Sequence, residues 1–363
     1  MIFSCVRPKT VLIAALINIV FSWHLASIYG SYGVAISNVI SWFFWFIFFI
    51  PRFTILTIQV ILGAAVAFKQ WWVVPGPEGG KIELRSVENR PPEGNQVLVK
   101  IKAAGINRGE LMSRPLLVSS NPRAKATPSG IEFAGLIDSL GPEVRGWSKA
   151  DRVMARASAC HAEFTLVDAT ALMKVPANLT LEAAAAIPNV YVTAHDAMVT
   201  EAALQANESI LITAGSSAVG CAAIQIAQYL GAKHIIATTR SSHKAGSLKK
   251  YGATEVINTT NPNWVEQVRD LTAGINVVID QVGGELFADC LSTMAIKGRF
   301  ISVGRNAGRD AKLNLDFLAR QRISLIGVTF RTRSKSEALA CSTRFASDLL
   351  PAFDKGLLQP VLD

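Results

Sequence analysis

The chain has 363 residues, of which 50% are hydrophobic and 17% charged, and its formal net charge is +9. This length predicts two or three domains. The positive charge is not accompanied by an arginine-rich run interleaved with aromatic residues, which argues against nucleic-acid binding. The five cysteines are scattered without a Cys-x-x-Cys pair, which argues against a zinc lobe and for a reducing compartment.

The apolar residues concentrate at the N-terminus. Residues 10–51 contain no Asp, Glu, Lys or Arg, and two apolar blocks there, 11–29 and 33–50, approach the length of about 20 residues that a bilayer-spanning helix needs. We therefore predict that residues 10–67 attach the protein to a membrane. The flanking Arg7, Lys9 and Arg52 predict that the remainder of the chain is cytoplasmic, provided that the third and shorter apolar block, 53–68, does not cross the membrane. The alternative is that the mature protein lacks this segment and is cytoplasmic.

A β-rich region follows the apolar blocks, from about residue 70 to 180. Short strands are predicted at 70–74, 81–87, 96–103, 135–138, 152–154 and 162–167. Within the third of these, Val97, Val99 and Ile101 alternate with polar residues, which is the period of a half-buried strand. The region is therefore predicted to form antiparallel sheet.

From about residue 182 the pattern changes to alternating strands and helices. Strands are predicted at 209–214, 233–238, 254–258, 275–280, 298–304 and 323–328, with helices between most of them. Six strands in this order predict a doubly wound parallel sheet. The segment 334–363 begins as a helix.

A small-residue turn follows the first of these strands. The run from Ser209 to Ile212 ends in a turn, and a helix pattern then extends to Leu230. A helix N-terminus that faces such a turn suits a pyrophosphate group. The residues predicted to hold it are Ala214, Gly215, Ser216, Ser217, Ala218, Val219 and Gly220. Ser217 stands where the dinucleotide-binding pattern has its middle glycine, so ordinary strand–helix packing is the alternative.

The next strand indicates which dinucleotide binds. An NAD-binding unit has an acidic residue near the end of this strand, but no Asp or Glu occurs between Glu208 and Glu255. Hydroxyl and cationic side chains stand there instead, and they suit a 2′-phosphate. We therefore predict NADP(H) as cofactor, with a solvated basic loop as the alternative reading. The predicted 2′-phosphate residues are Thr239, Arg240, Ser241 and Lys244.

A set of short segments, taken in chain order, forms a recognisable pattern. They are residues 97–114, Gly130-Ile-Glu-Phe-Ala-Gly135, Asp151-Arg-Val153, 185–194, the turn described above, Asp280-Gln-Val-Gly-Gly284, Ile301-Ser-Val-Gly304 and Phe330-Arg-Thr-Arg333. Together they resemble the zinc-independent quinone oxidoreductase branch of the medium-chain dehydrogenase/reductase superfamily. The resemblance covers about residues 68–363.

The resemblance implies an α/β architecture with a GroES-like β-rich catalytic domain and a doubly wound Rossmann nucleotide-binding domain. We expect the apolar membrane-type segment at 1–67, the catalytic domain at 68–187 and the NADP-binding domain at 188–328. Residues 329–363 are expected to return to the catalytic domain, and this last part looks cut short beside relatives.

The resemblance also implies roles for single residues. Asn107 is expected on the substrate side and Thr193 near the nicotinamide, as the catalytic residues. Zinc-dependent relatives have Cys near 105–107 and His at Ile131, and this chain has neither, so no metal is expected. Further cofactor contacts are expected from Val282, Gly304, Phe330 and Arg331.

The resulting hypothesis is an NADPH-dependent reductase that transfers a hydride to a quinone or another α,β-unsaturated carbonyl. One alternative is an enoyl-thioester reductase, although the tyrosine expected between Pro115 and Thr127 is missing. Another is a membrane-attached NADP-binding protein with little catalysis. A homodimer is left open. The neighbours His195-Asp196 and Cys160-His161 are expected to be structural, because adjacent residues do not face each other on a helix and no further metal ligands have suitable spacing.

Overall fold

A computed structural model of the chain describes residues 67–111, 121 and 124–362. The chain divides into two compact units, Met1–Ala67 and Phe68–Asp363. The predicted membrane segment therefore lies outside the described residues, apart from Ala67. Among the residues that are described, no helix combines the length and the apolar character that crossing a bilayer requires.

The second unit begins with a small antiparallel sheet. Strands β1 (Phe68–Val74) and β2 (Lys81–Val87) pair along their whole length, and β1 also pairs with the short β4 (Thr127–Pro128). The connection between β1 and β2 is a turn that contains Gly79 at φ 122°, a backbone conformation that glycine adopts without strain. Both long strands lie where the sequence predicts them.

A five-stranded antiparallel sheet completes the β-rich part. Its order is β7 (Phe164–Asp168), β3 (Gln96–Ala103), β5 (Glu132–Leu140), β6 (Arg152–Arg156) and β8 (Met173–Lys174). The side chains of Val97 and Val99 pack with Phe133, Ile137 and Val153 in one apolar cluster. The short helix α4 (Arg108–Leu111) follows β3, and the 3₁₀ helix η2 (Ala169–Ala171) follows β7. The predicted antiparallel region is confirmed; β5 and β6 are longer than their predicted ranges, β3 has the predicted bounds, and β7 starts two residues later than predicted.

Two short helices connect this part to the parallel sheet. Helix α5 (Leu181–Ala185) has Thr180 as its N-cap, and α6 (Val190–His195) continues directly into the π-helix η3 (Asp196–Glu201). A π-helix within a helical segment is rare and often accompanies a functional site. Here it places Asp196 in the interior, fully buried.

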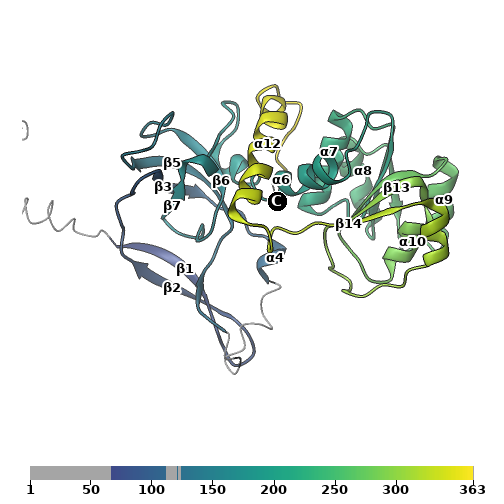
Figure 1. Cartoon of the computed structure of the whole chain (residues 1–363), viewed down its shortest axis with the longest axis horizontal. Helices are drawn as coiled ribbons and strands as arrows, with labels where there is room; N and C mark the ends of the chain where they lie inside the picture. Colours follow the sequence, from purple (N-terminus) through teal and green to yellow (C-terminus); the bar gives the residue numbers. More distant parts are fainter. Residues whose placement is uncertain (1–66, 112–120, 122–123, 363) are drawn as a thin grey trace, which may run out of the picture. The chain divides into compact units, whose positions relative to one another are not determined.

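The predicted doubly wound parallel sheet is confirmed (Figure 1). Its six strands stand in the order β11 (Glu255–Asn258), β10 (His234–Thr239), β9 (Ser209–Ile212), β12 (Ile275–Asp280), β13 (Met294–Ser302) and β14 (Ser324–Gly327), and every pair is parallel. The intervening helices are η4 (Ser242–Lys244), α7 (Ala218–Tyr229), α8 (Ala245–Lys250), α9 (Trp264–Leu271), α10 (Leu286–Ser292) and α11 (Leu315–Gln321).

The central strand β9 is buried on both faces, as its continuous apolar run predicts. Ile210 and Ile212 pack in the cluster that contains the buried side of α7 and Leu248 of α8. Leu211 points to the other face, into a second cluster with Trp264 of α9 and Leu291 of α10. Because side chains of β9 alternate between the two clusters, the sheet is packed between two layers of helices. The residues that follow the strand ends are not part of this packing.

The last helix, α12 (Lys335–Asp354), begins with a capping box formed by Ser334 and Glu337. Phe345 and Phe353 are completely buried, and the ring of Phe353 meets Tyr191 of α6 edge-on at a centroid distance of 5.0 Å. The Asn178 side-chain amide also donates to the Phe353 carbonyl oxygen over 2.9 Å. The chain's last helix is thus packed against the segment that carries α6.

We expect Phe353→Ala to lower the free energy of unfolding by about 3–5 kcal/mol, because it leaves a cavity in a closed core. Leu357 is a suitable control, since it lies four residues away and is 61% exposed; Leu357→Ala should change the same free energy by no more than about 0.5 kcal/mol. Urea unfolding of the full-length chain measures both. Equal losses would show that α12 is not anchored through Phe353.

Candidate active site

A buried carboxylate lies at the start of β5. Glu132 is only 1% exposed, and both its oxygens are occupied. Oε1 accepts from the Asn107 side-chain amide over 2.7 Å, and Oε2 accepts from the backbone N–H of Asn189 over 2.8 Å. Burial raises the pKa of Glu132, and the two hydrogen bonds oppose that rise. The carboxylate therefore holds two distant segments together.

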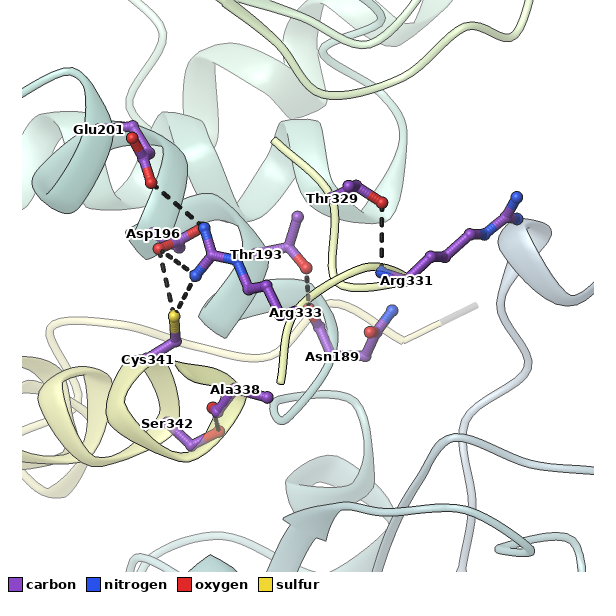
Figure 2. A network of polar contacts seen from close by, with 10 residues as sticks. All are labelled: Asn189, Thr193, Asp196, Glu201, Thr329, Arg331, Arg333, Ala338, Cys341 and Ser342. Carbon is purple, nitrogen blue, oxygen red and sulfur yellow. Dashed lines mark hydrogen bonds and ion pairs between the residues drawn. The ribbon is translucent and has the colours of Figure 1, made fainter. Parts of the chain in front are cut away.

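Asn189 joins the two predicted catalytic residues. Its side-chain amide donates to Oδ1 of Asn107 over 2.8 Å. Its carbonyl oxygen accepts from the Thr193 hydroxyl over 2.6 Å (Figure 2). The structure thus brings Asn107 and Thr193 to one place. Neither Asn189 nor Glu132 was singled out from the sequence, although both lie within segments that carry the family resemblance. The catalytic roles of Asn107 and Thr193 stay predictions.

Tight loops support this cluster. A Cβ atom added at Gly105 would lie 2.2 Å from Oε1 of Glu132, so only glycine lets the loop after β3 approach the carboxylate. The His161 ring bonds the Gly105 carbonyl oxygen over 3.0 Å and the Ser129 hydroxyl over 2.7 Å. Both ring nitrogens of His161 are therefore used to hold loops, as the structural reading of Cys160-His161 predicts.

A cation lies beside the cluster. Arg156, the last residue of β6, donates from Nε to Oδ1 of Asn189 over 3.2 Å, and its guanidinium carbon lies 3.7 Å from the centroid of the Phe330 ring. The guanidinium of Arg333 also stacks on this ring, at 5.0 Å. Phe330 was predicted to contact the cofactor; the structure places it against Arg156, close to the predicted catalytic residues.

Arg333 is anchored by acidic side chains of the π-helix (Figure 2). It forms two bonds with the buried Asp196 carboxylate, of 2.8 and 3.1 Å, and a third of 3.2 Å with Glu201. The neighbouring Arg331 extends the other way and donates to the Gly109 carbonyl oxygen over 3.0 Å. The segment after β14 is thus fixed to η3 on one side and to α4 on the other.

The predicted pyrophosphate turn lies at the carboxyl end of β9. Ser217 is the N-cap of α7, and its hydroxyl accepts from the Gly220 N–H over 3.0 Å. This explains a serine where the dinucleotide pattern has glycine. A Cβ atom at Gly220 would lie 2.5 Å from the Ala214 carbonyl oxygen, so the helix can approach the turn this closely only because residue 220 is glycine. The first-turn N–H groups of Ala218 and Val219 have no intrahelical acceptor and can face an anion.

Side chains from β12 fix this turn. The Asp280 carboxylate is fully buried and accepts from the Thr213 hydroxyl and from the backbone N–H groups of Val282 and Gly283. Gln281 accepts from the Ser217 hydroxyl over 2.9 Å. A Cβ atom at Gly304 would lie 2.3 Å from the Gln281 carbonyl oxygen. The turn, Val282 and Gly304 therefore form one connected surface.

The predicted 2′-phosphate residues lie at the end of β10, whose last residue is Thr239, and directly after it. The Thr239 hydroxyl accepts from the Ser241 N–H over 3.1 Å, which shapes the turn before η4. Arg240 and Lys244 are exposed, and neither side chain forms a hydrogen bond or an ion pair within the described part of the chain. Two cationic side chains without acidic partners, close after the end of β10, fit a phosphate better than the diol of an NAD ribose.

In residues 67–111, 121 and 124–362, no group of three or more His, Cys, Asp or Glu side chains is placed to hold a metal ion. The absence of zinc stays a prediction from the sequence. Cys160, Cys290 and Cys341 are free thiols. Burial raises the pKa of Cys160 and also that of Cys341, the latter to about 11, so neither is poised as a nucleophile.

Comparison with known proteins identifies the family. Residues 93–200 match the family described as "Alcohol dehydrogenase GroES-like domain", and residues 218–346 match "Zinc-binding dehydrogenase". Human "Quinone oxidoreductase" is 32% identical over 292 residues, which cover 79% of this chain and 86% of the human protein. The chain belongs to the quinone oxidoreductase branch of the medium-chain dehydrogenase/reductase superfamily.

Solved structures of this superfamily share the fold. The Escherichia coli quinone oxidoreductase complexed with NADPH aligns with a TM-score of 0.70 at 24% identity, over 82% of this chain and 91% of that one. The JamJ enoyl reductase aligns with a TM-score of 0.69 at 25% identity, over 81% and 90%. The predicted GroES-like and Rossmann-type architecture is confirmed, and the prediction of an oxidoreductase is confirmed at the level of the family. The Escherichia coli neighbour holds NADPH, the cofactor that the sequence predicts for this chain.

We expect Glu132→Gln to lower the free energy of unfolding by about 1–3 kcal/mol, because the new amide group must face an N–H donor where an acceptor stood. The exposed Glu266, whose nearest basic nitrogen is 4.0 Å away in Arg269, serves as the control. Glu266→Gln should stay within about 0.5 kcal/mol of the wild type. Chemical unfolding monitored by circular dichroism decides. Loss of the same size in both variants would contradict the role given to Glu132.

Proposed function

We propose that the chain is an NADPH-dependent reductase that works without zinc and transfers a hydride to a quinone or another α,β-unsaturated carbonyl. The observation that carries this proposal is the hydrogen-bonded group of Asn107, Asn189 and Glu132, to which Thr193 is also bonded. The same chain has a turn suited to a pyrophosphate after β9 of its parallel sheet. Membership of the quinone oxidoreductase branch supports it.

The residues described above fit the dinucleotide. The α7 N-terminus and the close approach at Gly220 suit the pyrophosphate, and Arg240 and Lys244 suit the 2′-phosphate. NADPH supplies the hydride when bound. The protein's own share is to orient the nicotinamide and the substrate and to exclude water from the reacting atoms.

Few of the described side chains at the site could donate a proton to the substrate as a general acid. Both Glu132 oxygens accept hydrogen bonds, and both His161 nitrogens are engaged. The Thr193 hydroxyl proton is given to the Asn189 carbonyl oxygen. A substrate whose reduced form takes its proton from water is therefore favoured, and a quinone meets this condition more easily than a simple ketone.

An enoyl-thioester reductase is the second candidate, since the JamJ enoyl reductase shares the fold at 25% identity. Attachment to a membrane through residues 10–67 also stays a prediction, as does a homodimer. The third reading, an NADP-binding protein with little catalysis, is an outcome of the assay below.

The deciding experiment is NADPH oxidation by the full-length chain with a panel of quinones, enones and enoyl thioesters. We expect turnover with quinones and with enones, and slower turnover with enoyl thioesters. Faster reduction of an enoyl thioester would reverse the order of the two candidates. Tight NADPH binding without turnover of any acceptor would instead favour the non-catalytic reading.

Cofactor choice gives a sharper prediction. Lys244→Ala removes one charged bond to the 2′-phosphate, which should weaken NADPH binding by about 1.5–3 kcal/mol and leave NADH binding nearly unchanged. The matched control is Lys250→Ala at the end of α8, since Lys250 is also exposed and takes part in no described ion pair. Isothermal titration with both dinucleotides measures the effect. Equal weakening of NADPH and NADH would place the 2′-phosphate elsewhere.

A further inference from the structure

Hydrogen bonds in the candidate site form a chain with one direction. Arg156 Nε donates to Oδ1 of Asn189, Nδ2 of Asn189 donates to Oδ1 of Asn107, and Nδ2 of Asn107 donates to Oε1 of Glu132. A guanidinium can only donate and a carboxylate can only accept, so the two ends fix the orientation of both amides. The relay runs from a cation through two amides to a buried anion.

This direction determines what the relay can offer a ligand. The side-chain oxygens of both asparagines and Oε1 of Glu132 are consumed within the relay, while each amide nitrogen keeps one further N–H. Nη1 and Nη2 of Arg156 form no hydrogen bond with any described residue. Three buried side-chain atoms lack a hydrogen-bond partner among the described residues, and neither of these two nitrogens is one of them, so both nitrogens are accessible. The guanidinium edge that faces away from Asn189 therefore still reaches solvent. The relay presents donors and no free side-chain acceptor.

Arg156 is also held in one orientation. Asn189 binds its Nε edge, and the Phe330 ring covers its plane at 3.7 Å. Phe330 is itself stacked by Arg333, which the buried Asp196 fixes. Burial lowers the pKa of Arg156, but an arginine stays protonated at physiological pH. A charged donor whose geometry is set in advance needs little reorganisation when charge develops nearby.

We propose that Arg156 is a catalytic residue whose free guanidinium edge receives the carbonyl oxygen of the substrate and stabilises the negative charge that forms there. The proposal rests on the proposed reductase function and assigns to that reaction a residue that neither the sequence motifs nor the family comparison single out.

The electron count of the step explains the need for such a group. An enone that gains a hydride at its β-carbon forms a C–H bond there, and the π pair of its C=C bond moves to close a C=C bond toward the carbonyl. The carbonyl π pair then becomes a lone pair on oxygen. The dinucleotide is oxidised, the enone is reduced to an enolate, and water later supplies the proton. A quinone ends the same step as a hydroquinone anion.

A first test measures oxyanion binding without turnover. 4-Nitrophenol is titrated spectroscopically when bound to the full-length chain in the presence of NADP⁺. Loss of one charged hydrogen bond corresponds to a pKa difference of about 1–2 units. We therefore expect the bound phenol to ionise at lower pH than free phenol, and Arg156→Met to remove a shift of that size. An unchanged shift in Arg156→Met would overturn the proposal.

A second test uses the reaction. Removal of one donor to a developing oxyanion lowers kcat by about 10²–10³-fold in known enzymes. For Arg156→Met we expect the larger loss with a simple enone, whose enolate is strongly basic, and a smaller loss with a quinone, whose hydroquinone anion is weakly basic. Equal losses for both acceptors would indicate a purely structural role. Arg156→Lys keeps the charge without the planar fork and should lie between wild type and Arg156→Met.

Controls separate the possible failures. Arg145→Met removes an exposed arginine that binds only the backbone carbonyls of Pro142 and Val144, and it should alter neither test. Thermal unfolding and NADPH affinity verify that each variant is folded, and Arg156→Lys replaces Arg156→Met if the latter is not. Phenolate binding that depends on Arg156 without reduction of any acceptor would refute the reductase function and retain the oxyanion site. Turnover that does not change when Arg156 is replaced would support the reductase function and refute the oxyanion site.

Discussion

The hydrogen bonds of the buried Glu132 carboxylate are the interaction on which the candidate site depends. An ionised carboxylate at 1% exposure costs several kcal/mol unless donors surround it. Its two donors, Asn107 and Asn189, come from the loop after β3 and from the N-cap of α6. The charge is therefore tolerated only when β5, the loop after β3 and α6 are assembled, and the geometry that satisfies it also brings Thr193 to Asn107.

The turn after β9, which is predicted to bind the nucleotide, depends on a second buried acid in the same way. Asp280 accepts from Thr213 at the end of β9 and from the N–H groups of Val282 and Gly283 after β12. Each acid thus draws donors inward and ties neighbouring segments together. The groups that stay available at the candidate site are N–H groups and cations. Such groups suit the phosphates of NADPH and a substrate whose oxygen gains negative charge.

The elements of the fold could be predicted because their signals are local. Alternation in β3 and the continuous apolar run of β9 each depend on a few consecutive residues, and the parallel order follows from repeated strand–helix units. Strand ends were less accurate. β5 begins at Glu132, three residues before the predicted start, because a charged residue interrupts the apolar pattern although its side chain is buried.

The polar partners in the site could not be predicted in the same way, because their contacts join residues far apart in the sequence. Asn189 lies 57 residues from Glu132 and 82 from Asn107, and Arg333 lies 137 from Asp196. Nothing in the neighbourhood of Asn189 indicates such a contact. The segment 130–135 was recognised through the family resemblance, but the resemblance does not show that the Glu132 carboxylate is buried or which donors meet it.

The segment after β14 connects the buried carboxylate of Asp196 to Arg156 in the candidate site. Asp196 fixes Arg333, Arg333 stacks on Phe330, and Phe330 covers the plane of Arg156. The relay from Arg156 to Glu132 is consequently oriented from both ends: by a carboxylate at one end and by an aromatic ring, itself held through a second carboxylate, at the other. Arg331 extends from the same segment to α4, directly after the loop that carries Asn107. A segment of four residues, 330–333, therefore fixes the cation and braces the loop that carries the amide, so the polar geometry of the site depends on contacts made by residues that follow the last strand of the sheet.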